Sequence, residues 1–385
     1  MARHIAANAL TFLILGLVVV LGLLKWGNDT FNGPGPLAEA AVVEVPRGAN
    51  LARVTQALTE AGAIRNETVF RIGARYTGQD DELKFGLYRI PAGASMVEIL
   101  DQLTSGTAAA ARFEATFTIN NGGVGLRLRD LLAEAPQEQP ETLEDALERV
   151  TALEEDGQSV AFRVSVSEGL TVFQVIEGLR AIPVMEGEIT EVPSEGMLAP
   201  DTYAFNEGAD RAALVAQMRA AQEARIAAAW EGRDAGLPID TPEELLVLAS
   251  IIEKETGVPQ ERGTVAAVFV NRLNRGMRLQ TDPTIIYGIT RGQSVFDRPI
   301  RRSDIDGVTE SREHGAVEYN TYQVDGLPPG PIANPGRASL EAAASPEASN
   351  FIYFVADGTG GHAFAETLEE HNRNVANYRR LQNGQ

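Results

Sequence analysis

The 385-residue sequence contains no cysteine. This absence excludes a disulfide framework, a thiolate metal site and a cysteine nucleophile. Basic residues are also scarce, because 33 Lys and Arg against 53 Asp and Glu leave a formal net charge of -20. A nucleic-acid-binding surface needs clustered Lys and Arg to displace counterions. The charge balance therefore favours an uncharged or mixed-charge polymer as the partner.

Histidine is rare, and the four histidines are scattered along the chain: His4, His314, His362 and His371. None has the HExxH spacing of a zinc site, so the sequence predicts no metal and no other cofactor. His362 follows a strand-like segment and is interpreted as a turn or packing residue rather than a ligand. The sequence also lacks a GxSxG nucleophile elbow, which argues against a serine hydrolase.

One long apolar run occupies residues 5–24, and Asn8 and Thr11 are its only polar interruptions. Its length is close to the roughly 20 residues that span a bilayer. Arg3 and His4 precede the run and Lys25 follows it, a weak bias that favours a cytoplasmic N-terminus. The alternative is a cleaved signal peptide, since residues 38–40 have the small-x-small form of a cleavage site. That site lies far beyond the run, after a GPGP linker, so an uncleaved membrane anchor is favoured.

A repeated pattern organises the first half of the chain. Segments that start at Val45, Ile90 and Val166 each contain a strand end, a glycine, a capping residue two positions later and apolar residues at helical spacing. The glycines are Gly48, Gly93 and Gly169, and the capping residues are Asn50, Ser95 and Thr171. This pattern predicts a unit of strand, turn and amphipathic helix.

The repeat has two interpretations. It is either duplicated scaffold without a ligand, or a carbohydrate-binding module, because its pattern resembles that of LysM-type domains, which bind N-acetylglucosamine polymers. Between the second and third repeats, residues 123–157 are acidic and have helical periodicity at Leu143, Ala146, Leu147 and Val150. We expect a solvated insertion with one surface helix there.

The clearest helix signal in the chain lies at residues 241–256. Thr241, Pro242 and Glu244 form a capping box with proline at the first helical position, and Gly257 ends the helix. Glu253 lies at the edge of an apolar stripe, where desolvation would favour the protonated carboxyl and allow it to donate a proton. Periodicity alone does not choose between Glu253 and Glu255, and both could instead be solvated residues.

Polar residues follow that helix in a pattern that indicates a binding site. A second helix carries Asn271, and we expect Gln280 and Thr281 on a turn facing the glutamate helix. Asp282 before Pro283 predicts another capped helix start, with a structural role for Asp282. Further on come the YNTY segment, residues 319–322, and a loop dense in proline and glycine, residues 326–336. Such loops are either plain connections or the wall of a groove.

Several of these motifs occur in an order that resembles a known family. The segments are LASIIEKETG, VFVNRL, MRLQTDPTIIYG, YNTY, GLPPGPIANPG and FVADGTGGHAF. Together they are similar to the MltG (YceG-like) family of endolytic murein transglycosylases. The resemblance implies Glu253 as the catalytic acid/base. It also implies that Asn271, Gln280, Asn320 and Tyr322 contact the substrate.

The resemblance implies an α+β fold with a single N-terminal transmembrane helix, a LysM-like βα repeat region and a mixed α/β catalytic domain. We expect a cytoplasmic tail at residues 1–4, the anchor at 5–26, a linker at 27–41, the LysM-like module at 42–106, the acidic insertion at 107–162 and the catalytic domain at 163–385. The protein would lie in the bacterial inner membrane with its catalytic domain in the periplasm. Its partners would be peptidoglycan glycan strands and, where it ends nascent strands, a peptidoglycan synthase.

The implied chemistry needs one carboxyl group. In the family, Glu253 would protonate the β-1,4 glycosidic oxygen after N-acetylmuramic acid, and its carboxylate would then deprotonate the sugar's own 6-hydroxyl. A 1,6-anhydro ring closes and no water is consumed. Two alternatives remain. One is a noncatalytic glycan-binding protein of the wall-synthesis machinery, and the other is a hydrolase in which Glu255 or Asp282 supplies a second carboxylate beside Glu253.

Overall fold

The computed structural model divides the chain into two compact units. One comprises residues 1–115 and 128–161, and the other comprises residues 116–127 and 162–385. The structure describes residues 2–46, 48–84, 86–105, 111–131, 133, 142–156, 158, 160–306 and 316–382, with the backbone alone for residues 2–14. His4 and His314 therefore lie outside the residues whose side chains are described.

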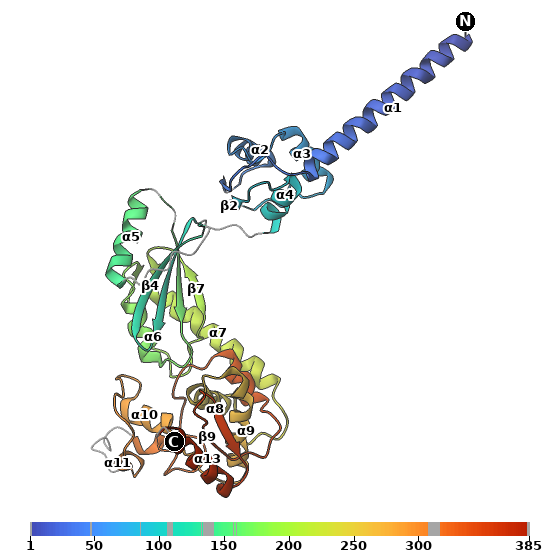
Figure 1. The fold of residues 1–385 in the computed structure, drawn as a ribbon. Coiled ribbons are helices and arrows are strands. Elements are labelled where there is room, and N and C mark those ends of the chain that lie inside the picture. Colours follow the sequence, from blue (N-terminus) through green and yellow to red (C-terminus); the bar gives the residue numbers. More distant parts are fainter. Residues whose placement is uncertain are drawn as a thin grey trace. The chain divides into compact units, whose positions relative to one another are not determined.

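The first unit begins with the long helix α1 (Ala2–Asn32), drawn in dark blue in Figure 1. Among the described residues, no helix has both the length and the apolar character needed to cross a membrane. The first ten residues of the predicted span at 5–24 lie outside that search, because their side chains are not described. The membrane anchor therefore stays a prediction.

After α1, the first unit contains the strand, turn and helix that each of the first two repeats predicts, with one further helix, α3, between them. Strands β1 (Ala41–Val45) and β2 (Gly86–Ile90) pair antiparallel, with Val43 opposite Tyr88. The helices that follow them are α2 (Leu51–Glu60), α3 (Glu67–Tyr76) and α4 (Met96–Ser105). Their apolar faces enclose a core around Phe70, Tyr88 and Leu103. The likeness to LysM-type domains stays a prediction.

The capping chemistry predicted for the three repeats is confirmed. The side chains of Asn50 and Thr171 accept hydrogen bonds from backbone amides in the first turn of their helices. The Ser95 Oγ accepts from the Glu98 amide at 3.4 Å at the start of α4 and donates to the Glu98 carboxylate. The three turn glycines all have positive φ, at 73°, 69° and 75° for Gly48, Gly93 and Gly169. Glycine adopts this left-handed conformation without the steric cost that other residues incur.

The acidic region contains more regular structure than we expected. The predicted surface helix is α5 (Leu143–Glu155), whose N-cap is Thr142. Strands β3 (Phe113–Asn120) and β4 (Gly123–Asp130) precede it and were not predicted. They join β5 (Val160–Val166) and β7 (Thr202–Phe205) in a sheet of order β4-β3-β5-β7. The alternating burial along β3 explains the strand, because every second side chain faces the core.

The third repeat supplies helix α6 (Val172–Arg180), which packs on this sheet. Gly178 of α6 lies against Ile119 of β3, and a Cβ at Gly178 would be 2.5 Å from the Ile119 Cγ2. The phenylalanine rings of β3, β5 and β7 cluster, with 5.7 Å between the centroids of Phe162 and Phe205. Two short strands, β6 (Met185–Glu186) and β8 (Ala209–Asp210), pair parallel to each other.

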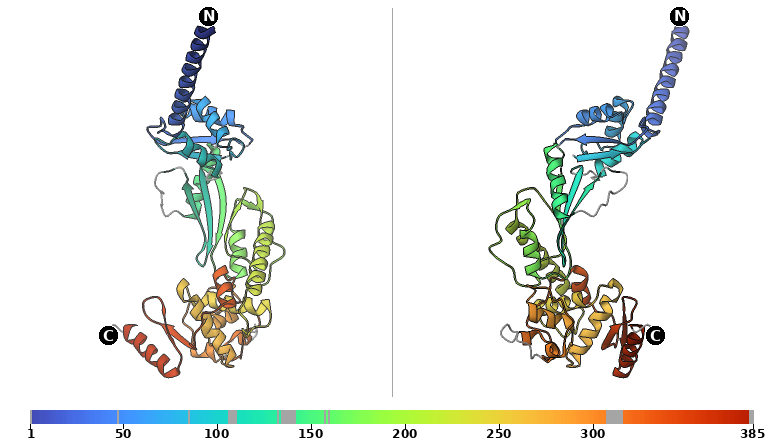
Figure 2. Two further views of the ribbon diagram at one scale, coloured as in Figure 1. Left: turned by 90° about the vertical axis from the view of Figure 1, so that its right-hand side faces the viewer. Right: turned by 60° about the vertical axis from the view of Figure 1, so that its left-hand side comes forward.

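The rest of the second unit is mainly helical (Figure 1). Its helices and strands, in chain order, are α7 (Arg211–Glu231), α8 (Pro242–Glu255), η1 (Pro259–Glu261), α9 (Arg262–Asn274), α10 (Asp282–Thr290), α11 (Arg302–Ile305), η3 (Ala316–Tyr319), α12 (Arg337–Ala344), β9 (Tyr353–Ala356), β10 (His362–Ala365) and α13 (Leu368–Gln382). Helix α8 is the centre of this part, and α7, α9 and α12 pack around it. Strands β9 and β10 form an antiparallel hairpin against which α13 packs (Figure 2).

Candidate active site

Helix α8 is almost wholly buried, which explains its unusual sequence. All eight residues from Leu245 to Ile252 are buried in the core. The helix begins as predicted, since Thr241 caps it by accepting a hydrogen bond from the Glu244 amide. It ends at Glu255, so its two C-terminal glutamates emerge from an apolar core. Because successive helical residues are rotated by about 100°, Glu253 and Glu255 point to different surroundings.

Glu253 is bound to the start of another helix. Its Oε2 accepts hydrogen bonds from the Gly336 amide at 3.0 Å and from the Ser339 hydroxyl at 2.7 Å. Gly336 is the N-cap of α12 and has no side chain with which to cap it. Glu253 therefore provides a carboxylate where an N-terminal helix dipole favours negative charge. This arrangement gives Glu253 a structural role in joining α8 to α12.

The turn of the third repeat lies beside Glu253. A Cβ on Gly169 would be 3.6 Å from the Glu253 Cγ, and the Lys254 Nζ donates to the Gly169 carbonyl at 3.1 Å. Glu168 lies nearby, and desolvation, followed by the charge of Glu253, raises the pKa of Glu168. The Asn334 side chain also contacts this turn. Its amide nitrogen donates to the Leu170 carbonyl, and its oxygen accepts from the Leu198 amide. Glu168 was not predicted as a site residue, although a glutamate before the turn glycine distinguishes this repeat from the other two.

Glu255 lies in a different environment. The Thr281 hydroxyl donates a hydrogen bond to its Oε1. Desolvation raises the pKa of the Glu255 carboxyl, the hydrogen bond from Thr281 lowers it, and the charge of Asp282 raises it. His362 and Arg272 lower the pKa of Glu255 by their charges. Desolvation is the largest of these causes, so the net effect is to raise the pKa of the Glu255 carboxyl.

Four motifs that are distant in the sequence meet around Glu255. The helix α9 provides Arg272, the QTDP turn provides Thr281 and Asp282, the YNTY segment provides Tyr322, and the GGHAF strand provides His362. The Tyr322 hydroxyl donates to the Asp282 Oδ1 at 2.8 Å. Desolvation, followed by this bond to Asp282, raises the pKa of Tyr322. Tyr322, one of the predicted substrate contacts, is therefore close to Glu255.

Gln280 lies on the turn that we expected to face the glutamate helix. Its side chain is exposed, its φ is 50°, and its amide donates to the Thr321 carbonyl at 3.1 Å. Thr281 is the N-cap of α10, so this helix begins at Asp282, one position earlier than predicted. The Asp282 side chain therefore does not cap the helix and instead accepts a hydrogen bond from the Tyr322 hydroxyl. An exposed amide beside Thr281 is compatible with the predicted substrate contact of Gln280.

Asn271 and Asn320 hold the backbone around the site. The Asn271 side chain donates to the carbonyls of Ser349 and Phe351, at 2.8 and 2.9 Å. Asn320 is 2 % exposed, and its side chain donates to the Ile305 carbonyl at 2.9 Å. These bonds occupy the amide nitrogens of both residues. Their predicted contact with substrate stays a prediction.

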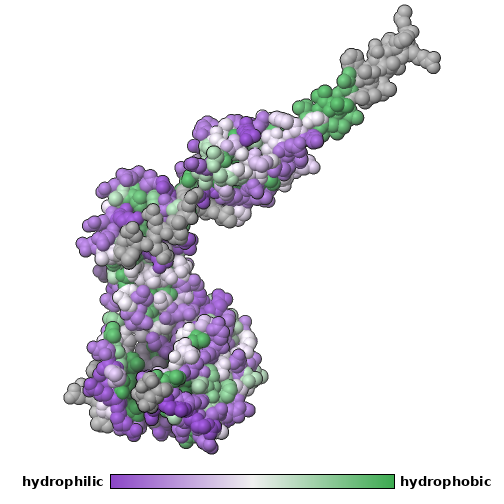
Figure 3. Space-filling view, viewed as in Figure 1, coloured by the Kyte–Doolittle hydropathy of each residue, from purple (hydrophilic) through white to green (hydrophobic). Residues whose placement is uncertain are grey.

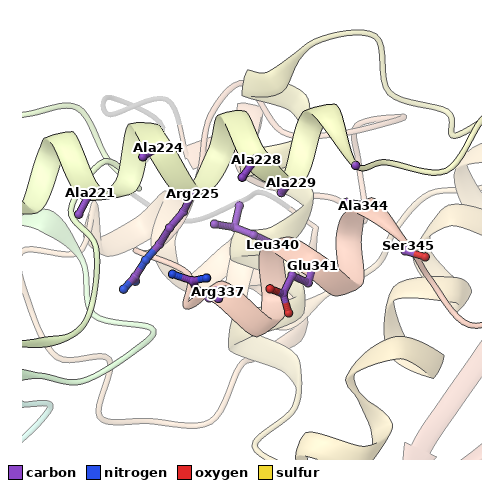
Figure 4. Close-up of a pocket in the computed structure, with 11 residues that line it drawn as sticks. Ala221, Ala224, Arg225, Ala228, Ala229, Arg337, Leu340, Glu341, Ala344 and Ser345 are labelled. Carbon is purple, nitrogen blue, oxygen red and sulfur yellow. The ribbon is translucent and has the colours of Figure 1, made fainter.

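Two grooves lie outside this cluster. One, of about 510 Å³, runs between α7 and α12 and is lined by alanines of the two helices together with the charged residues Arg225, Arg337 and Glu341 (Figure 4). The other, of about 400 Å³, is walled by Gly326 to Pro329 and the first turns of α8. The proline-rich loop thus forms the wall of a groove, at the end of α8 opposite the two glutamates. Within the described ranges, no group of three or more His, Asp or Glu side chains has the geometry of a metal site.

Comparison with known proteins places these residues in a family. The sequence profile of the YceG-like family matches residues 43–377. The chain belongs to the YceG-like family. An endolytic murein transglycosylase from Bacillus subtilis (strain 168) is 28% identical over 337 residues, covering 87% of this chain and 84% of that protein.

Other relatives have the same name or family. An endolytic murein transglycosylase from Streptococcus pneumoniae serotype 2 is 28% identical over 344 residues. The match covers 87% of this chain but 58% of the pneumococcal protein, so the chain spans little more than half of that relative. A crystal structure of a YceG-like protein from Listeria monocytogenes has 27% sequence identity and a TM-score of 0.42, over 87% of this chain and 98% of that chain.

Proposed function

We propose that this YceG-like protein is a membrane-anchored endolytic murein transglycosylase. It would cut the β-1,4 bond between N-acetylmuramic acid and N-acetylglucosamine inside a glycan strand and leave a 1,6-anhydro end. The names of its relatives support the reaction class. The observation that carries the proposal is the convergence of four motifs on one desolvated carboxyl group, that of Glu255.

Two glutamates compete for the acid/base role. The motif resemblance assigns it to Glu253, whose Oε2 already accepts two hydrogen bonds from α12. A proton-donating carboxyl is expected to be desolvated, and desolvation raises the pKa of the Glu255 carboxyl. We therefore propose Glu255 as the acid/base and keep Glu253 as the alternative.

One carboxyl group is sufficient for this reaction. Protonated Glu255 gives its proton to the glycosidic oxygen as the bond from that oxygen to C1 of the muramic acid breaks. The 6-hydroxyl oxygen of the same sugar forms a new bond to C1, and its proton passes to the Glu255 carboxylate. The acid is regenerated, and the two product strands together have the mass of the substrate. A hydrolase would need a second carboxyl placed to activate water.

The surface of α1 supports the membrane anchor. From Leu15 to Leu24 the large apolar side chains of this helix are all more than half exposed, and Figure 3 shows this stretch in green. Exposed apolar surface of this extent is unfavourable in water. A bilayer would cover it, with the N-terminus in the cytoplasm and the catalytic unit in the periplasm. An anchor there would keep the enzyme close to synthases and let it end nascent strands.

The test is product analysis of purified peptidoglycan digested by the full-length protein in detergent. Wild type should release 1,6-anhydro ends. The rate of release should fall by more than about 100-fold in Glu255→Gln and should stay close to the wild-type rate in Glu253→Gln. The matched control is Glu369→Gln, which removes a carboxylate that is 86% exposed on α13. The reverse ranking of the two variants would move the acid role to Glu253.

Other outcomes would contradict the reaction itself. Products heavier by one water, with a reducing end, would identify a hydrolase. Binding to glycan strands without any cleavage by wild type would identify a noncatalytic protein. The anchor is tested by alkaline extraction of membranes: wild type should stay in the pellet, and a variant with Val19→Lys and Leu21→Lys should be released. Release of the wild type would refute the anchor.

A further inference from the structure

Thr321, in the YNTY segment, binds two consecutive amides of the turn in front of α10. Its carbonyl oxygen accepts from the Gln280 amide at 3.1 Å, and its Oγ1 accepts from the Thr281 amide at 3.0 Å. The exposed fraction of Thr321 is 0 %. It was not predicted as a site residue, although its neighbours Asn320 and Tyr322 were. Thr321 therefore acts on this turn from inside the protein, where no substrate reaches it.

The main chain of Thr281 is held by two buried hydroxyls, those of Thr284 and Thr321. The Thr284 hydroxyl donates its one proton to the Thr281 carbonyl at 2.7 Å. The oxygens of the two hydroxyls are 2.9 Å apart, so the proton in the bond between them comes from Thr321. The Thr281 amide and carbonyl are thus both fixed. Because a β-branched side chain has few favourable χ1 rotamers, this fixed main chain restricts the direction of the Thr281 hydroxyl.

The Thr281 hydroxyl binds the proposed acid instead of its own helix. An N-cap side chain usually accepts a hydrogen bond from an amide of the first turn, but among the described residues Thr281 makes no such bond. Its hydroxyl donates to the Glu255 Oε1. The preceding residue, Gln280, has a φ of 50°, a left-handed conformation that is unfavourable for residues other than glycine. Both features are unfavourable for the fold alone, and the two bonds to Thr321 maintain them.

The two oxygens of Glu255 have different surroundings. Oε1 accepts from Thr281, whereas Oε2 has no hydrogen-bond partner among the described residues. Oε2 is also not one of the enclosed polar atoms that lack a partner, so solvent reaches it. A protonated carboxyl has one O–H group and one oxygen that only accepts. The bond from Thr281 to Oε1 therefore favours a proton on Oε2, the oxygen that a substrate can reach.

We propose that Thr321 is a positioning residue for the acid: its hydroxyl holds the Thr281 main chain so that the Thr281 hydroxyl binds Oε1 of Glu255, and Oε2 is the atom that exchanges the proton. In the first step, the Oε2 proton passes to the glycosidic oxygen as the bond from that oxygen to C1 breaks. The Thr281 hydroxyl then donates to a carboxylate, and a hydrogen bond to a charged group is stronger than one to a neutral group.

The same bond therefore stabilises the state in which Glu255 is an anion more than the state in which it is an acid. In the second step, the 6-hydroxyl oxygen forms its bond to C1, and the proton of that hydroxyl returns to Oε2. This role of Thr321 rests on the proposed assignment of the acid to Glu255.

The test is a double-mutant cycle on kcat for the release of 1,6-anhydro ends by the full-length protein. Thr281→Val removes the hydroxyl that binds Glu255, and Thr321→Val removes the hydroxyl behind it but keeps the carbonyl that binds Gln280. Each should lower kcat by about tenfold, the effect of losing a hydrogen bond to a charged group, with a smaller change in KM. The double variant should be no slower than Thr281→Val alone, because Thr321 acts through the Thr281 hydroxyl. Losses that multiply would overturn the proposal.

Two further variants of Thr321 separate its hydroxyl from its bulk. Thr321→Ser keeps the hydroxyl and should keep most of the wild-type kcat, so a serine variant as slow as the valine variant would also overturn the proposal. Thr321→Ala removes the hydroxyl without placing a methyl group against the Thr281 amide, and it replaces Thr321→Val if the valine variant does not fold. The matched control is Thr55→Val in α2, which removes another hydroxyl of a residue that is 0 % exposed, bonded to the Leu51 carbonyl at 2.6 Å. It should leave kcat unchanged.

The pH profile gives a readout that a purely structural role would not change. The hydrogen bond from Thr281 lowers the pKa of Glu255, so its loss in Thr281→Val or Thr321→Val should move the basic limb of kcat/KM to higher pH. The other groups that act on Glu255 stay in place in these variants: Asp282 of α10, Arg272 of α9 and His362 of β10. An unmoved limb in Thr321→Val, with only thermal stability lowered, would show that Thr321 is purely structural.

The failure of this proposal is distinguishable from the failure of the acid assignment. Full activity of Glu255→Gln would refute the assignment of the acid to Glu255. An inactive Glu255→Gln beside a fully active Thr321→Val would refute only the positioning role of Thr321.

Discussion

Glu253 and Glu255 lie two residues apart at the end of α8, yet they have no bonding partner in common. Glu253 accepts hydrogen bonds from the Gly336 amide and from the Ser339 hydroxyl of α12. Glu255 accepts a hydrogen bond from the hydroxyl of Thr281, the N-cap residue of α10. A separation of two residues turns side chains by about 200° around a helix. The same short motif thus supplies one carboxylate that joins two helices and another that belongs to the polar cluster in front of α10.

Removing the Glu253 carboxylate should destabilise the protein. Glu253→Ala leaves the amide of Gly336, the N-cap residue of α12, and the Ser339 hydroxyl without their acceptor, and loss of a helix cap costs about 0.5–2 kcal/mol. Ser339→Ala should cost about 1 kcal/mol. Because both changes remove the same bond, the double variant should be less destabilised than the sum of the two. Denaturant unfolding of the four proteins measures this coupling.

The control for that cycle is Glu253→Gln. Its amide oxygen can still accept from Gly336 and Ser339, so we expect most of the stability to remain. Additive losses in the alanine variants, within about 0.3–0.5 kcal/mol, would show that Glu253 does not act through α12.

Neutralising Asp282 should move the pH dependence of activity to lower pH. The charge of Asp282 raises the pKa of Glu255. Asp282→Asn keeps an oxygen for the Tyr322 hydroxyl but removes the charge, so Glu255 should lose its proton at lower pH. The basic limb of kcat/KM should then move to lower pH.

A paired measurement separates charge from hydrogen bonding at Asp282. Tyr322→Phe removes the donor and leaves the carboxylate charge in place. This variant should reduce kcat without moving the basic limb of the kcat/KM profile to lower pH. If Asp282→Asn left the limb where it is in wild type, Glu255 would not be the group that titrates in the profile.

The sequence predicted local structure well because the signals for it are local. The turn glycines, the caps of α2 and α6 and the proline start of α8 each depend on a few neighbouring residues. The motif order also identified the family that the profile match confirms. The strands β3 and β4 were not predicted, because the acidic composition around them concealed their alternation.

The partners of the two glutamates could not be predicted from spacing. Gly336 and Ser339 lie more than 80 residues after Glu253, and His362 lies about 100 residues after Glu261. Helical periodicity says which side of a helix a residue faces and not which distant segment packs there. Likewise Asn271 and Asn320, predicted as substrate contacts, bond to backbone carbonyls that only the folded chain brings near.

Glu195 should make stability depend on pH. Burial raises the pKa of Glu195 from 4.5 to about 7, although the Val172 and Gly196 amides and the Tyr287 hydroxyl donate to it and lower it. The folded protein therefore holds a proton that the unfolded chain releases between pH 4.5 and 7. This group's contribution to stability is complete below about pH 4.5 and is lost as pH rises through 7.

Glu195→Gln should remove that dependence. Its amide oxygen can accept from the Val172 amide without becoming charged. We expect similar apparent Tm values for variant and wild type at pH 4.5, and a more stable variant at pH 8, by on the order of 2 kcal/mol. Thermal unfolding from pH 4.5 to 8.5 measures the difference. A variant that is less stable at pH 8 would show that Glu195 is charged and well paired in the fold.

Gly178 should be a position where a better helix former destabilises the protein. Alanine in a helix interior is favoured over glycine by about 0.5–1 kcal/mol. At Gly178, however, the added Cβ would lie 2.5, 2.9 and 3.0 Å from three carbons of Ile119, which is 1 % exposed and held in β3. Overpacking of this kind costs about 1–3 kcal/mol, so the net effect of Gly178→Ala should be a loss of stability. Gly125→Ala, where no atom lies within 4 Å of the new Cβ, is the control and should be neutral or slightly stabilising. Ile119→Val in the Gly178→Ala background should recover part of the loss, because it removes one of the carbons that the new methyl group meets. A Gly178→Ala variant as stable as wild type would mean that α6 and β3 can separate without cost.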